Sequence, residues 1–281
     1  MIIGIIGLGL IGTSLALSFK KEFKNVYLWG VDKDNKVLDY LSERKILDVL
    51  GKDITRLRDL IGESDYIFIS VYPSGVVDVV ENLKNYVSEK VIITDTASTK
   101  FKIMNYMNRD EFLRKSFIGG HPLAGREVSG PLGAVDNLFT GKVYFLCPAF
   151  EVSEEKVEGL RRIIEKINAS PIIIDPEKHD EILAFTSHLP QIIAYLLSYV
   201  SVKEDNLSFF GSGFKDTTRI SKSDYNLWLD ILKENDIKIK EALVEFEKTL
   251  KDLIENLERK DFEKIRHIFK DSREKRLRLR D

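Results

Sequence analysis

Hydrophobic residues in the first half of the chain fall into short apolar runs separated by segments with helical spacing. The runs cover residues 2–6, 26–31, 66–71, 91–95, 117–120 and 142–146. One intervening segment follows Pro73 and places apolar side chains at Val76, Val77, Val80 and Leu83, the spacing of an amphipathic helix. Regular alternation of this kind predicts an α/β fold with a largely parallel sheet wound on both faces.

The pattern changes after Pro148. One helix is predicted over 153–167 and one strand over 171–174, and almost only helices follow, including segments at 228–232 and 242–257. We therefore predict a sheet domain over 1–148 and an all-helical domain over 149–281. The segment 187–200 is apolar nearly all round, which predicts cover on most sides, either in a dimer interface or in a buried core.

The first apolar run breaks into a Gly-x-Gly-x-x-Gly turn and continues as a predicted helix. Asp32 closes the second apolar run about 20 residues further on, the spacing of a dinucleotide site in a Rossmann-type sheet. A carboxylate there accepts hydrogen bonds from a ribose hydroxyl and repels a 2′-phosphate, which favours NAD over NADP, although Lys33 beside it weakens that preference. The expected cofactor-binding residues are Gly7, Gly9, Leu10, Ile11, Gly12 and Asp32.

Composition limits the classes of partner that this chain is expected to bind. The 43 basic and 45 acidic residues nearly cancel, so no global field recruits nucleic acid or an anionic membrane, and a small-molecule substrate is expected. A lone cysteine, Cys147, excludes an internal disulfide and agrees with a reducing cytoplasmic location. The N-terminal run lacks a basic flank and a small-residue cleavage site, so we expect no targeting segment.

Two segments follow predicted strands at the sheet edge where ligands bind, residues 95–100 and 119–127. His121 lies there between glycines and a proline, and an imidazole so placed can take a proton from an alcohol as hydride leaves the same carbon. It can equally satisfy loop carbonyls. Ser98 is a candidate to orient the same hydroxyl, or to cap the following helix.

Polar segments also interrupt the helical half. Arg219 lies one turn from Lys215, and its planar fork suits a substrate carboxylate, although a solvated surface pair is the alternative. We expect His179 and His267, which lie among charged residues, to be solvated. No His, Asp and Glu spacing indicates a metal site.

Five segments together closely resemble the prephenate/arogenate dehydrogenase family of tyrosine biosynthesis. They are Gly-Leu-Gly-Leu-Ile-Gly (7–12), Asp-Thr-Ala-Ser-Thr-Lys (95–100), Gly-His-Pro-Leu-Ala-Gly-Arg-Glu (120–127), Thr-Ser-His-Leu-Pro-Gln (186–191) and Gly-Phe-Lys-Asp-Thr-Thr-Arg-Ile (213–220). The resemblance implies an NAD-dependent oxidative decarboxylation of prephenate to 4-hydroxyphenylpyruvate, or of arogenate to tyrosine. It also implies a homodimer formed through the helical domain.

The resemblance assigns roles to matching positions. His121 matches the catalytic histidine that binds and deprotonates the C4 hydroxyl, Ser98 the serine hydrogen-bonded to that hydroxyl, and Arg219 an arginine that holds a substrate carboxylate. His188 and Gln191 fall in the substrate segment, where many relatives have a second histidine in place of Gln191. We therefore expect Arg126, where relatives often carry threonine, to replace that contact and pair with the side-chain carboxylate of prephenate.

Two other readings stay open at this point. A dehydrogenase of the β-hydroxyacid type has a similar two-domain plan but depends on a lysine in the helical half, so His121 argues against it. A noncatalytic NAD(H)-sensing dimer would bind the cofactor but would not need His121, Ser98 and Arg219 to converge.

Overall fold

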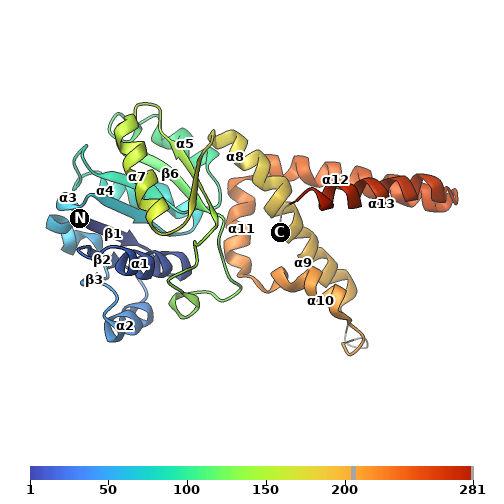
Figure 1. Cartoon of the computed structure of the whole chain (residues 1–281), viewed down its shortest axis with the longest axis horizontal. Coiled ribbons are helices and arrows are strands. Elements are labelled where there is room, and N and C mark those ends of the chain that lie inside the picture. The colour runs from blue at the N-terminus through green and yellow to red at the C-terminus, as the bar shows by residue number, and fades with distance from the viewer. Residues whose placement is uncertain (204–206, 280–281) are drawn as a thin grey trace. The chain divides into compact units, whose positions relative to one another are not determined.

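The computed structural model describes residues 1–203 and 207–279. Within them, eight strands form one sheet in the order β3-β2-β1-β4-β5-β6-β7-β8 (Figure 1). The strands are β1 (Ile2–Ile6), β2 (Tyr27–Val31), β3 (Val49–Gly51), β4 (Tyr66–Ile69), β5 (Ile92–Asp95), β6 (Phe117–Pro122), β7 (Val143–Pro148) and β8 (Ser170–Ile173). The order reverses between β1 and β4, which is where ligands bind in such sheets.

The predicted largely parallel sheet is confirmed, with one exception. β6 and β7 run antiparallel, with His121 opposite Phe145, whereas the other neighbouring strands run parallel. A short 3₁₀ turn (Pro131–Gly133) and loops join these two strands in place of a crossover helix, which permits the reversal. β3 escapes sequence analysis because three residues are too few for a periodic signal.

Helices cover both faces of the sheet. On one face, α1 (Leu10–Glu22), α2 (Asn35–Arg44) and α7 (Glu154–Lys166) pack a core that includes Leu15, Phe19 and Ile164. On the other, α3 (Arg58–Glu63), α4 (Val76–Leu83) and α5 (Phe101–Met107) bury Val80 and Met104. The alternating pattern of the sequence therefore produces the doubly wound arrangement that it predicts.

The sheet continues beyond the predicted domain boundary. The sequence predicts that the sheet domain ends at residue 148, but α7 covers the sheet and β8 pairs with β7. The last strand therefore ends at Ile173. Helices alone follow in the described residues: α8 (Pro176–Leu183), α9 (Leu189–Ser201), α10 (Ser212–Thr218), α11 (Tyr225–Glu234), α12 (Asp236–Glu258) and α13 (Phe262–Leu277), with short 3₁₀ and π turns between some of them.

By its contacts the chain divides into two compact units, residues 1–236 and 237–281. The first holds the sheet and the helices through α11. The second is built by α12 and α13, in which Asp261 caps α13 by accepting a hydrogen bond from the Lys264 N–H at 3.2 Å.

One helical stretch of the first unit is strongly apolar. α8 runs through a π-helical turn (Ala184–His188) into α9, and by length and composition alone the whole stretch would suit a membrane span. It buries polar residues within the unit, however, among them His179, Asp180 and Gln191. Leu196, Tyr199 and Val200 of α9 are exposed in the single chain, so the buried-core alternative does not account for this face.

Candidate active site

The turn after β1 forms a cradle for an anion. Gly7 has φ +89°, in the left-handed region that favours glycine, and a Cβ added to Gly12 would lie 2.0 Å from the Gly7 carbonyl oxygen. At Gly9, by contrast, an added Cβ would have no atom of the described residues within 4 Å, apart from its chain neighbours. α1 therefore packs closely on β1, while its N-terminal N–H groups remain open to approach at Gly9, as a bound pyrophosphate requires.

Asp32 lies directly after β2, beside this cradle. Its two carboxylate oxygens accept hydrogen bonds from the Leu8 N–H at 2.8 Å and the Asp34 N–H at 2.9 Å, which fixes the side chain in place. Asp32 lines a cavity of about 1030 Å³ together with Gly9, Lys33 and other residues. A carboxylate held at this point fits a ribose 2′-hydroxyl and opposes a 2′-phosphate, so the residues present fit NAD.

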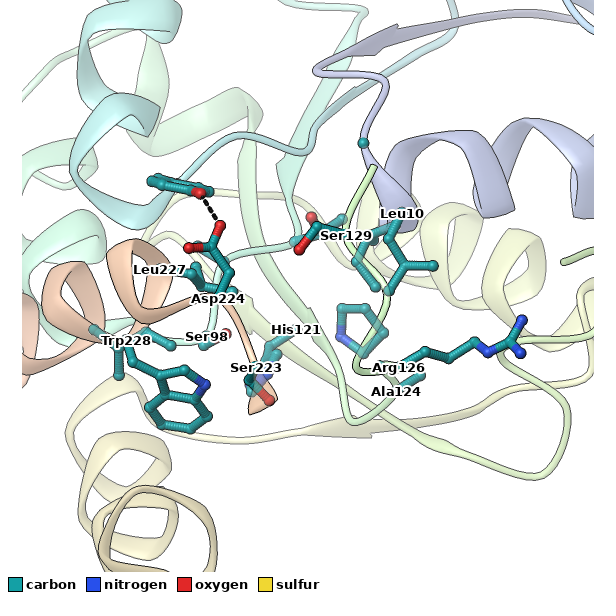
Figure 2. Close-up of a pocket in the computed structure, with 18 of the residues that line it drawn as sticks. Leu10, Ser98, His121, Ala124, Arg126, Ser129, Ser223, Asp224, Leu227 and Trp228 are labelled. Atoms are coloured by element: carbon teal, nitrogen blue, oxygen red, sulfur yellow. Dashed lines mark hydrogen bonds between the residues drawn. The ribbon is translucent and has the colours of Figure 1, made fainter. Parts of the chain in front are cut away.

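A second cavity, of about 860 Å³, meets the first at Gly9 and at residues 70–72. Its size is that of a small-molecule site. Residues of the sheet and of the helical half both line it, among them Ser98, His121, Asp224, Leu227 and Trp228 (Figure 2). Arg219 lines the same cavity. A dinucleotide that lies over Gly9 can therefore reach both cavities, with Asp32 at one end and His121 at the other.

His121 stands near the carboxyl end of β6 and is 8% exposed. Its Nδ1 lies 2.8 Å from Nε2 of His179, so this ring nitrogen is already engaged inside the protein. Burial, together with the nearby His179 and the Lys100 ammonium, holds the pKa of His121 well below its usual range. The imidazole is therefore neutral near pH 7, the form in which it can accept a proton.

Ser98 follows β5 and lines the same cavity. The structure does not support its alternative role as a helix cap, because α5 begins at Phe101 with Lys100 at the cap position. The carboxylate of Asp180 takes that role instead, accepting hydrogen bonds from the Lys100 N–H at 2.8 Å and the Phe101 N–H at 2.9 Å. The Ser98 hydroxyl is therefore not the cap of α5.

Arg219 brings a cation to the cavity from the segment after α10. Its guanidinium pairs with the Glu127 carboxylate and its side chain is 58% exposed. Five N–H donors allow a guanidinium to hold a second carboxylate beside the first. The structure thus brings His121 of the sheet and Arg219 of the helical half to one cavity, as the sequence predicts.

A hydrogen bond joins the two halves across this cavity. The Tyr72 hydroxyl donates to the Asp224 carboxylate at 2.6 Å, drawn as the dashed line in Figure 2. Burial and the carboxylate together raise the pKa of Tyr72 to about 12, so the phenol keeps its proton. Nearby, the Ser74 N–H donates to Asp230 of α11 at 2.9 Å. The loop after β4 is therefore fixed to the helical half.

Comparison with known proteins agrees with this geometry. The family model described as the nucleotide-binding domain of prephenate dehydrogenase matches residues 15–173, and the model of its dimerization domain matches residues 175–271. The prephenate dehydrogenase of Bacillus subtilis is 31% identical over 96% of this chain and 74% of its own length. This chain belongs to the prephenate dehydrogenase family.

Other members of the prephenate dehydrogenase family are similar over nearly the whole chain. The cyclohexadienyl dehydrogenase of Zymomonas mobilis is 31% identical over 99% of this chain and 96% of its own length. The crystal structure of prephenate dehydrogenase from A. aeolicus with hydroxyphenyl propionate and NAD+ has a TM-score of 0.91 at 29% identity, covering 99% of this chain and 97% of that one. The crystal structure of Synechocystis arogenate dehydrogenase has a TM-score of 0.79 at 28% identity, covering 98% of this chain and 99% of that one.

Two residues that the family motif places at the substrate lie behind the cavity wall. In the described part of the chain, neither His188 nor Gln191 lines the cavity. Gln191 is buried and donates its side-chain N–H to the Ile220 carbonyl at 2.8 Å, so its amide holds the backbone next to Arg219. His188 packs edge-on against Trp228, which does line the cavity. Both therefore contact residues that line the cavity.

Arg126 lines the cavity but is turned away from His121 (Figure 2). Its guanidinium donates to the Gly133 carbonyl at 2.9 Å. This bond engages one N–H group of the fork that we expected to hold the side-chain carboxylate of prephenate. This orientation does not support that expectation.

The expectation that His179 is solvated is wrong. His179 is fully buried between His121 and Asp180, with its Nδ1 2.7 Å from the Asp180 Oδ1. Lys178 and Glu181 lie exposed on the same helix, which made the local sequence look like a solvated surface. The sequence signal that was present is Asp175-Pro176, a helix cap and first-turn proline that place residue 179 one turn into a helix.

Proposed function

We propose that this protein is a prephenate dehydrogenase that uses NAD+ to convert prephenate to 4-hydroxyphenylpyruvate and CO2. The observation that carries the proposal is the single cavity that His121, Ser98 and Arg219 line, which opens onto the Gly9 cradle. Membership of the family and the NAD+ complex of the A. aeolicus relative support the cofactor.

Each residue has a chemical role in the proposal. The neutral His121 accepts the proton of the C4 hydroxyl, and Ser98 donates a hydrogen bond that orients the same oxygen. Arg219 holds a substrate carboxylate, and Gly7, Gly9, Leu10, Ile11, Gly12 and Asp32 hold the dinucleotide. NAD+ supplies the hydride acceptor when bound. The ring carboxylate departs as CO2, and its bonding electron pair completes the aromatic ring.

Arogenate is the second candidate substrate. It differs from prephenate by an amino group in place of the keto group on the side chain, and the relatives named cyclohexadienyl and arogenate dehydrogenase support it. Glu127 beside Arg219 places a negative charge where an ammonium could bind. Prephenate remains our first proposal because the Bacillus subtilis, Lactococcus lactis and A. aeolicus relatives are named prephenate dehydrogenases.

We also propose a cytoplasmic homodimer joined through the helical domain. The match to a dimerization domain and the exposed apolar side chains of α9 support a second copy of this chain as the partner. The single cysteine, which is buried, agrees with the cytoplasm.

The decisive experiment follows NADH absorbance with prephenate, arogenate and short β-hydroxyacids, each with NAD+ or NADP+. We expect turnover of prephenate with NAD+, and a loss of about 10²-fold or more in kcat for His121→Asn because the general base is removed. His267→Asn, at an exposed position of α13, is the matched control. Normal turnover by His121→Asn, or turnover of β-hydroxyacids alone, would contradict the proposal.

A further inference from the structure

His121 and two further buried groups, His179 and Asp180, form a chain of hydrogen bonds that leads away from the cavity. Nδ1 of His121 lies 2.8 Å from Nε2 of His179, and Nδ1 of His179 lies 2.7 Å from Oδ1 of Asp180. All three are at most 8% exposed. Phe145, opposite His121 on β7, packs edge-on against the His179 ring with centroids 5.2 Å apart, which restricts rotation of that ring.

The hydrogen bonds of Asp180 identify its form. Oδ1 accepts from the Lys100 N–H as well as facing His179, and Oδ2 accepts from the Phe101 N–H. Both oxygens therefore act as acceptors, which a carboxylate can do and a carboxylic acid does poorly. Burial raises the pKa of Asp180, whereas these two N–H donors and the Lys100 charge favour the ionised form.

The direction of each remaining hydrogen bond follows. Facing a carboxylate, Nδ1 of His179 must carry the proton. Burial lowers the pKa of His179 to about 2, so the ring is neutral and its Nε2 has no proton. Nδ1 of His121 must then be the donor to His179. Since His121 is also neutral, its one proton is on Nδ1 and its Nε2 carries a free lone pair.

We propose that His179 and Asp180 are positioning residues that hold His121 in the Nδ1–H tautomer and so present a basic Nε2 to the substrate hydroxyl. Neither touches the substrate. This inference rests on the proposed role of His121 as the base. In the other tautomer Nε2 would carry a proton and could not accept one from the substrate, although cofactor and substrate would still bind.

The tautomer can be read directly, because the chain has four histidines. In the full-length protein labelled with [15N]histidine, two-dimensional NMR distinguishes protonated from bare ring nitrogens. His121→Asn and His179→Leu serve to assign the signals of these two rings. We expect His121 to be protonated at Nδ1 and bare at Nε2, and His179 likewise. A proton on Nε2 of His121 in the unmodified protein would overturn the proposal, whatever the variants do.

Activity supplies the second measurement. His179→Leu removes the acceptor, whereas His179→Gln keeps a carbonyl oxygen near the place of Nε2. We expect kcat to fall about 10²-fold in His179→Leu with KM nearly unchanged, and to recover about 10-fold of that loss in His179→Gln. We avoid substituting Asp180 because it also caps α5. His267→Gln is the control, and the thermal midpoint of each variant reports whether it folds.

The outcomes separate this inference from the proposed function. Wild-type kcat in folded His179→Leu would overturn the positioning role. If His179→Leu does not fold, the proposal is tested by the tautomer in the unmodified protein and by the activity of His179→Gln. A kcat of His179→Gln more than about 10²-fold below that of the wild type would count against the proposal. Normal turnover in His121→Asn would show that His121 is not the base, which would contradict the proposed function. The tautomer measured for His121 would still stand as a result.

Discussion

Gly9 and Gly12 stand three residues apart in one turn, yet the structure gives them different tasks. A methyl group on Gly12 would meet the backbone oxygen of Gly7, which cannot move without displacing the strand. A methyl group on Gly9 would enter open space. We therefore expect stability to depend on Gly12 and the approach of the cofactor to depend on Gly9.

Alanine substitutions test this division. We expect Gly12→Ala to lower the free energy of unfolding by about 1–3 kcal/mol through overpacking. Gly9→Ala should leave that free energy unchanged and weaken NADH binding about 10-fold or more, because the new methyl group occupies the approach to the pyrophosphate. Urea unfolding and NADH fluorescence titration measure the two effects.

Gly213→Ala, in α10 where the described residues also leave space for a methyl group, is the control for both measurements. Equal loss of stability in Gly9→Ala and Gly12→Ala would show that the two glycines do not differ as described.

The candidate residues at the cavity were predictable where a local pattern places them. His121 and Ser98 follow predicted strands, and the edge of a parallel sheet collects such residues whatever the rest of the fold. His179 was not predictable, because its burial depends on Asp180 capping α5, a helix 80 residues earlier in the chain. The hydrogen bond from Arg126 to the Gly133 carbonyl was not predictable for a similar reason, because no sequence pattern marks a backbone carbonyl as a partner.

At the scale of elements, α9 carries a long apolar pattern that one chain leaves partly uncovered. Leu196 is 53% and Tyr199 86% exposed. The sequence predicted the apolar character correctly, because periodicity records which side chains avoid water. The sequence could not distinguish a buried core from an interface, because both remove the same apolar surface from water.

Leu196→Glu tests the interface. A buried carboxylate without a partner is unfavourable, so we expect the variant to dissociate to monomers at micromolar concentration while the wild type sediments as a dimer. Sedimentation velocity measures the mass, and circular dichroism confirms the fold. Lys24→Glu, at an exposed position before β2, is the charge-changing control. A wild-type monomer, or an unaltered Leu196→Glu dimer, would contradict the assignment.

At the scale of the whole molecule, buried histidines make stability depend on pH. His188 is 1% exposed, and burial lowers its pKa to about 4. The folded protein thus keeps His188 neutral where the unfolded chain binds a proton. Its contribution to stability is complete above about pH 6.5 and is lost as pH falls toward 4.

His188→Asn removes this titration while keeping an acceptor for the Asn235 amide, which lies 3.3 Å from the His188 Nδ1. We expect the wild type to lose about 3 kcal/mol relative to the variant between pH 7 and pH 4. Urea unfolding at several pH values measures the difference. His267→Asn, on an exposed residue, should track the wild type. A wild-type to His188→Asn difference that stays constant with pH would contradict the expectation.

The contact between β6 and α8 restricts how ligands can come and go. Asp180 joins α8 to the start of α5, and His179 joins the same helix to His121. In the proposed mechanism, a movement of α8 away from the sheet during product release would break the hydrogen bond that holds His121, the proposed base. We therefore expect substrate and product to enter and leave by movements elsewhere along the rim of the cavity, so that the His121 imidazole keeps its orientation between turnovers.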